Sequence, residues 1–160
     1  MLPIIKKLTE KKLVGHSIEM SFIENKTFQL WSGFMSNRKE IKNAIDANLY
    51  SLEVYAENHF DNFDPNDSFH KWAAVEVSDY QTIPEGMKTL IVPDGLYAVF
   101  LHLGPATEAH KTYHYIFAEW LPNSEYTVDD RPHFAVMDHK YKKDDPTSEE
   151  EIWIPIKNRN

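Results

Sequence analysis

The sequence has no cysteine among its 160 residues, and this absence removes several kinds of site at once. Disulfide bonds, thiolate zinc centres and cysteine nucleophiles all need that residue. A chain of this length buries roughly two thirds of its unfolded surface, so it can fold without a disulfide or a structural metal. The lack of cysteine also fits the reducing cytoplasm, where we expect the protein to be located.

Long apolar runs and an excess of basic residues are missing as well. No stretch approaches the ~18 consecutive apolar residues of a membrane-spanning helix, and no signal peptide is visible. The formal net charge is −8, and lysines and arginines form no long run. Most of such a surface would repel DNA, so the sequence predicts neither direct DNA binding nor a membrane partner.

Common nucleotide, metal and nucleophile motifs are also absent. The chain has 5 glycines, and no GxGxxG, GxxxxGK or Gly-x-Ser-x-Gly pattern occurs. His110 and His114 lie four residues apart, but no glutamate follows His110, so the zinc-protease pattern fails. Asp61, Asp64 and Asp67 lack the glycine and glutamate of a calcium loop. The sequence therefore predicts no cofactor and no metal site.

Aromatic residues, in contrast, are abundant. They make up 13% of the chain, with 4 Trp, 8 Tyr and 9 Phe. Part of this set must build the core, and the surplus is what a flat, apolar ligand site needs.

The pattern of apolar residues predicts an α+β fold. Alternating or β-branched segments predict strands over residues 13–23, 49–55, 72–77, 87–92, 96–103, 134–140 and 151–157. One amphipathic helix is expected to begin at Thr27 and to extend towards Ile45, with a break near Ser36-Asn37, and another to begin at Thr107. Pro93-Asp94-Gly95 predicts a hairpin turn, and residues 59–67 predict a polar loop.

The order strand, helix, strand, strand occurs twice, which predicts an internal duplication. Leu30-Trp31 and Phe34–Asn37 are echoed by Ile116-Phe117 and Trp120–Asn123 in the second half. We therefore expect one domain over residues 1–160, made of half-modules at about 1–80 and 86–160. The seam between paired half-modules is a common place for a ligand cleft.

The last predicted strand carries a carboxylate among apolar residues. The two-residue period of a strand places its three isoleucines on one face and Glu151, Trp153 and Pro155 on the other. A buried carboxylate is costly unless a ligand or a hydrogen bond compensates it. Spacing alone equally allows Glu151 to stay solvated at the end of an acidic turn. Pro155 predicts an edge strand or a bulge, because proline cannot donate to a sheet ladder.

Six segments carry a family resemblance through their order and spacing: Trp72–Val77, Ile83–Met87, Pro93–Pro105, Glu119–Pro122, Arg131–Phe134 and Glu151–Ile156. Together they resemble the GyrI-like small-molecule-binding domain, which is also the effector-binding domain of AraC- and MerR-type regulators. The resemblance implies two β-α-β-β modules with pseudo-two-fold symmetry, an antiparallel sheet, two main helices and a central ligand cleft. It also implies that Glu151 is the pocket carboxylate. Family members often have Phe-Glu where this chain has Phe134-Ala135, so a second carboxylate is missing.

Three functions remain open at this point. The first is a stand-alone protein that senses or sequesters an aromatic, often cationic, small molecule. Glu151 would supply the charge, and five aromatic residues are candidate walls: Trp153, Trp72, Tyr97, Trp120 and Phe134. The second, which the resemblance to stand-alone family members implies, is a hydrolase that opens the cyclopropane ring of DNA-alkylating compounds, with Glu151 as general base. The third is a partner of gyrase or of a regulator. The chain has no room for a helix-turn-helix domain, so we do not expect a transcription factor.

Overall fold

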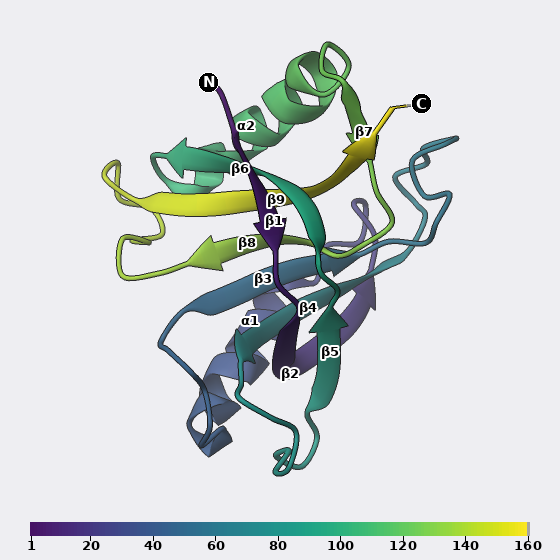
Figure 1. Ribbon diagram of the computed structural model, residues 1–160. Helices are drawn as coiled ribbons and strands as arrows, with labels where there is room; N and C mark the ends of the chain where they lie inside the picture. Colours follow the sequence, from purple (N-terminus) through teal and green to yellow (C-terminus); the bar gives the residue numbers. More distant parts are fainter. Residues whose placement is uncertain (160) are drawn as a thin grey trace.

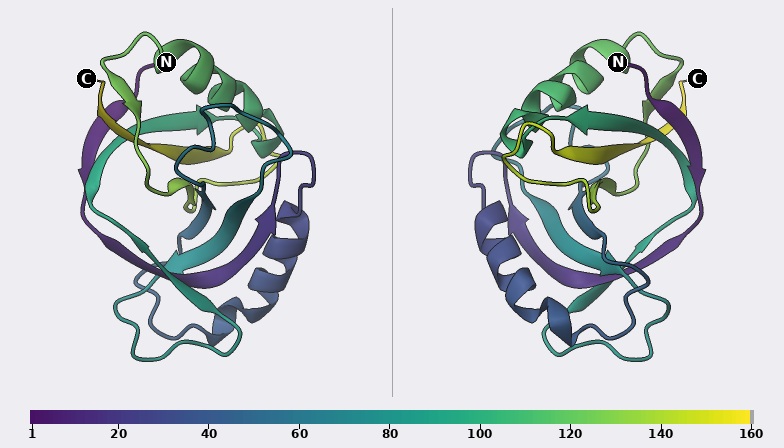
Figure 2. Two further views of the ribbon diagram at one scale, coloured as in Figure 1. Left: turned by 90° about the vertical axis from the view of Figure 1, so that its right-hand side faces the viewer. Right: turned by 90° about the vertical axis from the view of Figure 1, so that its left-hand side faces the viewer.

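The computed structural model, which describes residues 1–159, is a curled antiparallel sheet with helices on its outer face (Figures 1 and 2). The strands are β1 (Ile4–Leu8), β2 (Lys11–Met20), β3 (Leu49–Val54), β4 (Phe69–Glu76), β5 (Lys88–Val92), β6 (Gly95–Leu103), β7 (Tyr126–Val128), β8 (His133–Met137) and β9 (Glu149–Asn158). The helices are α1 (Thr27–Asn37) and α2 (Ala109–Tyr115), with 3₁₀ turns η1 (Arg38–Glu40) and η2 (Ala106–Glu108) and a π-helical turn η3 (Ile116–Trp120).

Two β-α-β-β modules build this sheet, which confirms the predicted α+β fold. The strand order is β1-β6-β9-β8-β3-β4-β2-β5, and β7 pairs with β9. The first module contains β2, α1, β3 and β4, and the second contains β6, α2, β8 and β9. The modules meet where β3 pairs with β8, with Ser51 opposite Ala135.

Each module also receives a strand from the other half of the chain. β1 pairs with β6, and β5 pairs with β2. The predicted hairpin at Pro93-Asp94-Gly95 is therefore wrong, because the strands on either side of it pair with different partners. The segment is a crossing between modules. Gly95 has a φ of +153°, and the Arg131 guanidinium lies 2.5 Å from where a Cβ would be, so both backbone and space require glycine there.

Three apolar clusters fill the two faces of the sheet. Inside the curl, Leu8 of β1 and Val92 of β5 pack into the same cluster as residues of the central strands, so the two sheet edges close over a common core. On the outer face, α1 covers β2 and β4, and α2 with η3 covers β6 and β9. Figure 2 shows the two helices apart from each other on this outer face. The middle of the sheet, at β3 and β8, lies between them.

Several local expectations differ from the structure. Helix α1 ends at Asn37, where the break was expected, but no helix resumes towards Ile45: after η1 the backbone of Ile41 is extended, which lets its side chain enter the core under α1. Thr107 does not cap the second helix, which begins through the η2 turn without a side-chain cap. Neither α1, at 11 residues, nor any other helix of the described chain has the length and apolar character needed to cross a bilayer.

Pro155 lies inside the sheet, so the predicted edge or bulge is wrong. β9 pairs with β6 on one side, where Pro155 is opposite Tyr97. On its other side, β9 pairs with β8 up to Trp153 and with β7 from Ile156 onwards. Pro155 occupies the position between these two partners. A missing N–H is tolerated at a point where one neighbouring strand has ended and the next has not begun.

Glycine at position 15 provides a test of the packing between β2 and β4. A Cβ there would lie 2.0 Å from the carbonyl oxygen of Ala73, whereas a Cβ on Gly33 of α1 would meet only His16 Nδ1 at 3.9 Å. We expect Gly15→Ala to lower the free energy of unfolding by about 3 kcal/mol, because the backbone of β2 or β4 must move to make room for the methyl group. Gly33→Ala should raise it by about 0.5–1 kcal/mol. Urea unfolding checks both values, and equal effects would contradict this packing.

Candidate functional site

A cleft of about 670 Å³ lies between the two modules, on the outer face of the sheet. Its walls come from the start of α1, from α2 and η3, from strands β3, β4 and β8, and from the segment after β3. The lining residues are Met20, Phe22, Asn25, Thr27, Glu53, Tyr55, Phe60, Phe63, Phe69, Lys71, His110, Tyr113, His114, Phe117 and His133. Both modules therefore contribute to one predominantly aromatic site.

Strand register places three polar residues in a row across the floor of the cleft. Glu53 of β3 is opposite Lys71 of β4 and also opposite His133 of β8. Lys71 has the same parity on β4 as Ala73 and Val75, which pack under α1, so the row faces the helices.

Glu53 and Lys71 form an ion pair in this floor. The Lys71 ammonium donates a hydrogen bond to the Glu53 carboxylate, and the side chains are 14% and 12% exposed, respectively. Within the described chain, Glu53 is the only acidic residue and Lys71 the only lysine or arginine that line the cleft. Removing either partner would leave a largely buried charge without its counter-charge.

Two tyrosine hydroxyls share the cleft with this ion pair. Burial, and then the negative charge of Glu53, raise the pKa of Tyr55 and of Tyr113 above the ordinary value. Both phenols therefore stay protonated at physiological pH and can donate a hydrogen bond to a bound molecule.

His133 is the third polar residue of the floor and belongs to an aromatic cluster. Its ring is 5% exposed, stacks on Phe117 at 6.3 Å and meets Tyr55 edge-on at 4.9 Å. Burial lowers the pKa of His133 to about 3, so the ring is neutral at pH 7. The predicted polar loop over residues 59–67 is only partly polar, because Phe60 and Phe63 join this cluster.

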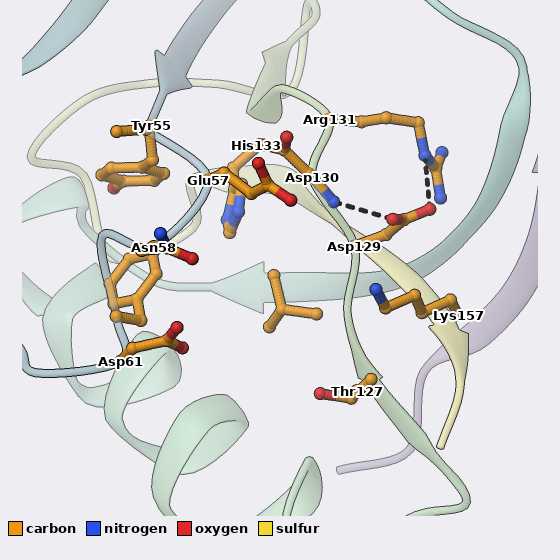
Figure 3. Close-up of a pocket in the computed structure, with 13 residues that line it drawn as sticks. Tyr55, Glu57, Asn58, Asp61, Thr127, Asp129, Asp130, Arg131, His133 and Lys157 are labelled. Atoms are coloured by element: carbon orange, nitrogen blue, oxygen red, sulfur yellow. Dashed lines mark hydrogen bonds and ion pairs between the residues drawn. The ribbon is translucent and has the colours of Figure 1, made fainter. Parts of the chain in front are cut away.

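A second cavity, of about 530 Å³, shares Tyr55, Phe60 and His133 with the cleft. Figure 3 shows it with residues that follow β3 on one side and residues 127–131 on the other. Its walls are more polar, and Arg131 Nε donates to Asp129 at 3.1 Å. The same guanidinium also donates to backbone carbonyls of Leu96 and Ile156, so it holds β6 and β9 in place.

The five aromatic residues predicted as walls do not reach the cleft. Trp72, Tyr97, Phe134 and Trp153 lie inside the curl, in the core on the opposite face of the sheet. Trp120 packs on the core under α2, with its ring edge-on to Phe100 at 5.2 Å. These side chains stabilise the fold.

Glu151 also lies away from the cleft. The predicted parity of the last strand is confirmed, because Ile152, Ile154 and Ile156 pack together under α2 while Trp153 is inside the curl. A neighbouring side chain, not a ligand, compensates the partial burial of the Glu151 carboxylate: Trp153 Nε1 donates a hydrogen bond to Glu151 Oε1 at 3.0 Å. The structure thus places the predicted carboxylate on the face opposite the aromatic cleft.

Sequence reasoning missed Glu53 and Lys71, although each one left a signal. Glu53 is the one charged residue of β3, and Lys71 directly precedes the apolar run Trp72–Val75 of β4; a charge in such a position is unfavourable without a partner. This signal is weak, because the sequence identifies the partner of each charge only when the two strands are already known to be neighbours.

The neutral ring of His133 predicts a pH dependence of stability. An ordinary histidine takes up a proton near pH 6.5, so the unfolded chain gains a proton that folded His133 does not accept until about pH 3. The free energy of unfolding should therefore fall as the pH drops from 6.5 towards 4. In the wild type this fall should be steeper than in His133→Phe, by up to about 1.4 kcal/mol per pH unit. Urea unfolding at several pH values tests this, with the exposed His139→Phe as control. Identical pH profiles for wild type and His133→Phe would contradict it.

Comparison with known proteins gives both a family and several fold neighbours. Residues 1–157 match the family described as the GyrI-like small molecule binding domain. The transcriptional regulator BrlR of Pseudomonas aeruginosa is 30% identical over 129 residues, which are 80% of this chain and 45% of BrlR. The chain thus spans about half the length of that regulator.

Solved structures of similar fold cover nearly the whole chain. The EcmrR C-terminal domain has a TM-score of 0.72 at 12% identity, covering 98% of this chain and 97% of that one. SAV2435, solved with bound tetraphenylphosphonium, has a TM-score of 0.71 at 19% identity, covering 98% and 94%. A hydrolase encoded by lin2189 from Listeria innocua has a TM-score of 0.60 at 12% identity, covering 98% and 92%. With its two modules and the cleft between them, this chain belongs to the GyrI-like small-molecule-binding family.

Proposed function

We propose that this chain binds a small aromatic organic molecule in the cleft between its modules, and thereby senses or sequesters that molecule. The observation that carries the proposal is the cleft of about 670 Å³ with aromatic walls from both halves of the chain. Its volume lies within the roughly 300–1,000 Å³ typical of small-molecule sites, which combine apolar walls with a few polar groups.

The geometry of the walls favours a ligand with aromatic rings. Phe60 and Phe117 stack at 6.1 Å, and Phe22 and Phe63 meet edge-on at 5.6 Å. Flat rings can extend such a cluster through further stacked and edge-on contacts. The tetraphenylphosphonium bound to SAV2435 carries four aromatic rings, which supports this class of ligand. A role in sensing is supported by the match to the regulator BrlR.

Binding is favoured over hydrolysis by the state of the carboxylates. A general base must be free to take a proton from water beside the substrate. Glu53, which lines the cleft, is already paired with Lys71. Glu151 accepts a hydrogen bond from Trp153 on the other face of the sheet. Neither carboxylate is placed for that role, so we do not extend the activity of the lin2189 hydrolase to this chain.

Calorimetric titration with three related probes tests the proposal. Diphenylethylamine, diphenylacetate and diphenylacetamide share two phenyl rings and differ in charge, and we expect at least one of them to bind. Phe117→Ala should weaken that binding by about tenfold or more, because a buried aromatic contact is lost. Phe28→Ala, at a residue that is 84% exposed and outside the cleft, is the matched control and should have no effect.

Glu151→Gln separates this site from the one expected from the sequence. Because Glu151 faces away from the cleft, the variant should bind the probes as the wild type does. The proposal is wrong if none of the three probes binds. It is also wrong if Glu151→Gln abolishes binding while Phe117→Ala leaves it intact.

A further inference from the structure

The ion pair in the floor of the cleft constrains the charge of the molecule that can bind there. Glu53 and Lys71 lie opposite each other on neighbouring strands, and each side chain is less than 15% exposed. Within residues 1–159, no other acidic residue, lysine or arginine lines the cleft. The cleft lining therefore holds one carboxylate and one ammonium in direct contact, together with the imidazoles of His110, His114 and His133.

A charged ligand would have to break this contact or remain near a like charge. A cation that displaces the Lys71 ammonium from Glu53 leaves that ammonium among aromatic side chains without a counter-charge. An anion that binds Lys71 leaves the Glu53 carboxylate in the same position. A charged ligand that leaves the pair intact instead lies beside a like charge, so either a lost counter-charge or like-charge repulsion opposes binding.

His133, Tyr55 and Tyr113 add no charge to the cleft, and Glu150 lies outside its lining. Burial lowers the pKa of His133 to about 3, so its ring is neutral at pH 7. Tyr55 and Tyr113 are neutral phenols. Glu150 is on the same face of the sheet, but it lines a separate cavity of about 30 Å³. Burial raises the pKa of its carboxyl group while the charge of Lys71 lowers it, so Glu150 lies within electrostatic range of the pair although it does not line the cleft.

The pair keeps spare hydrogen-bonding capacity towards the cleft. An ammonium group has three donors and a carboxylate has about four acceptor positions, and the mutual contact uses one of each. A group with a donor beside an acceptor can bind both partners without separating them. Hydrogen bonds to ionised groups are also stronger than those between neutral groups.

Building on the proposed function, we propose that the ligand is an aromatic molecule without net charge that carries a carboxamide-type group. Its N–H donates to the Glu53 carboxylate, and its carbonyl oxygen accepts from the Lys71 ammonium. Its rings lie against the aromatic walls, where Phe117 and Phe60 stack. Glu53 and Lys71 are thus the residues that determine specificity for charge.

The three diphenyl probes test this directly on the wild-type chain. Diphenylacetamide should bind about tenfold tighter than diphenylethylamine and diphenylacetate, because only the amide leaves the ion pair intact. If the amine or the acid binds most tightly, the inference is overturned while the proposed function stands. If none of the three binds, the proposed function itself is refuted, and this inference with it.

Single substitutions should change the preferred probe in opposite directions. Lys71→Met leaves the Glu53 carboxylate unpaired, so the amine should become the tightest ligand. Glu53→Gln leaves the Lys71 ammonium unpaired, so the acid should become the tightest. Lys11→Met is the matched control, because Lys11 forms a part-buried pair with Glu76 at 3.0 Å outside the cleft. If Lys71→Met and the control bind the three probes in the same order of affinity, Glu53 and Lys71 do not determine specificity for charge.

A double variant keeps the test valid if an unpaired charge prevents folding. Glu53→Gln combined with Lys71→Gln removes both charges and retains polar groups of similar size. Its circular dichroism spectrum should match the wild type. Diphenylacetamide should bind it about tenfold more weakly, because neutral hydrogen bonds replace charge-assisted ones. Unchanged amide affinity in this folded variant would contradict the role of the ion pair.

Discussion

The pairing of β3 with β8 is the constraint on which both the fold and the site depend. It is the contact that joins the sheets of the two modules, and its register sets Glu53 opposite His133. A shift of one residue would turn these side chains into the curl and expose Leu52 and Phe134, which are now fully buried, because successive side chains point to opposite faces. Burial of the inner core therefore fixes the register that gives the cleft its polar floor.

The curl of the sheet divides the aromatic residues between two roles. Inside it, Tyr97, Phe134 and Trp153 pack against one another, with ring centroids 5.2–5.7 Å apart. On the outer face, the helices cover the two ends of the sheet and leave its middle to aromatic side chains such as Tyr55 and Phe60. The same residue types thus build a closed core on one face and an open site on the other, and the topology decides which.

This division explains what the sequence could and could not predict. Local periodicity predicted the α+β class, the repeated module and the alternation of the last strand, because these depend on neighbours in the chain. The exchange of β1 and β5 depends on pairing between distant segments, and the turn residues at Pro93–Gly95 occur in a crossing as readily as in a hairpin. Alternation placed Glu151 and Ile152 on opposite faces, but it could not tell which face meets the cleft. Glu53 and Lys71 become a pair only through the neighbouring positions of β3 and β4.

A Glu–Lys pair in the floor of a cleft differs from a single carboxylate in the ligand charge that it favours. A buried pair contributes little net stability, since the cost of removing two charges from water roughly offsets their attraction. In the proposed complex its effect on recognition is larger, because Lys71 would cancel the long-range attraction of Glu53 for cations while both groups would still offer hydrogen bonds at short range. On a common GyrI-like fold, the charge of an acceptable ligand would then depend on the side chain beside the carboxylate. Replacement of both partners together can then change selectivity without changing the fold, because no buried charge is left unpaired and the cleft lies outside the core that holds the two modules together.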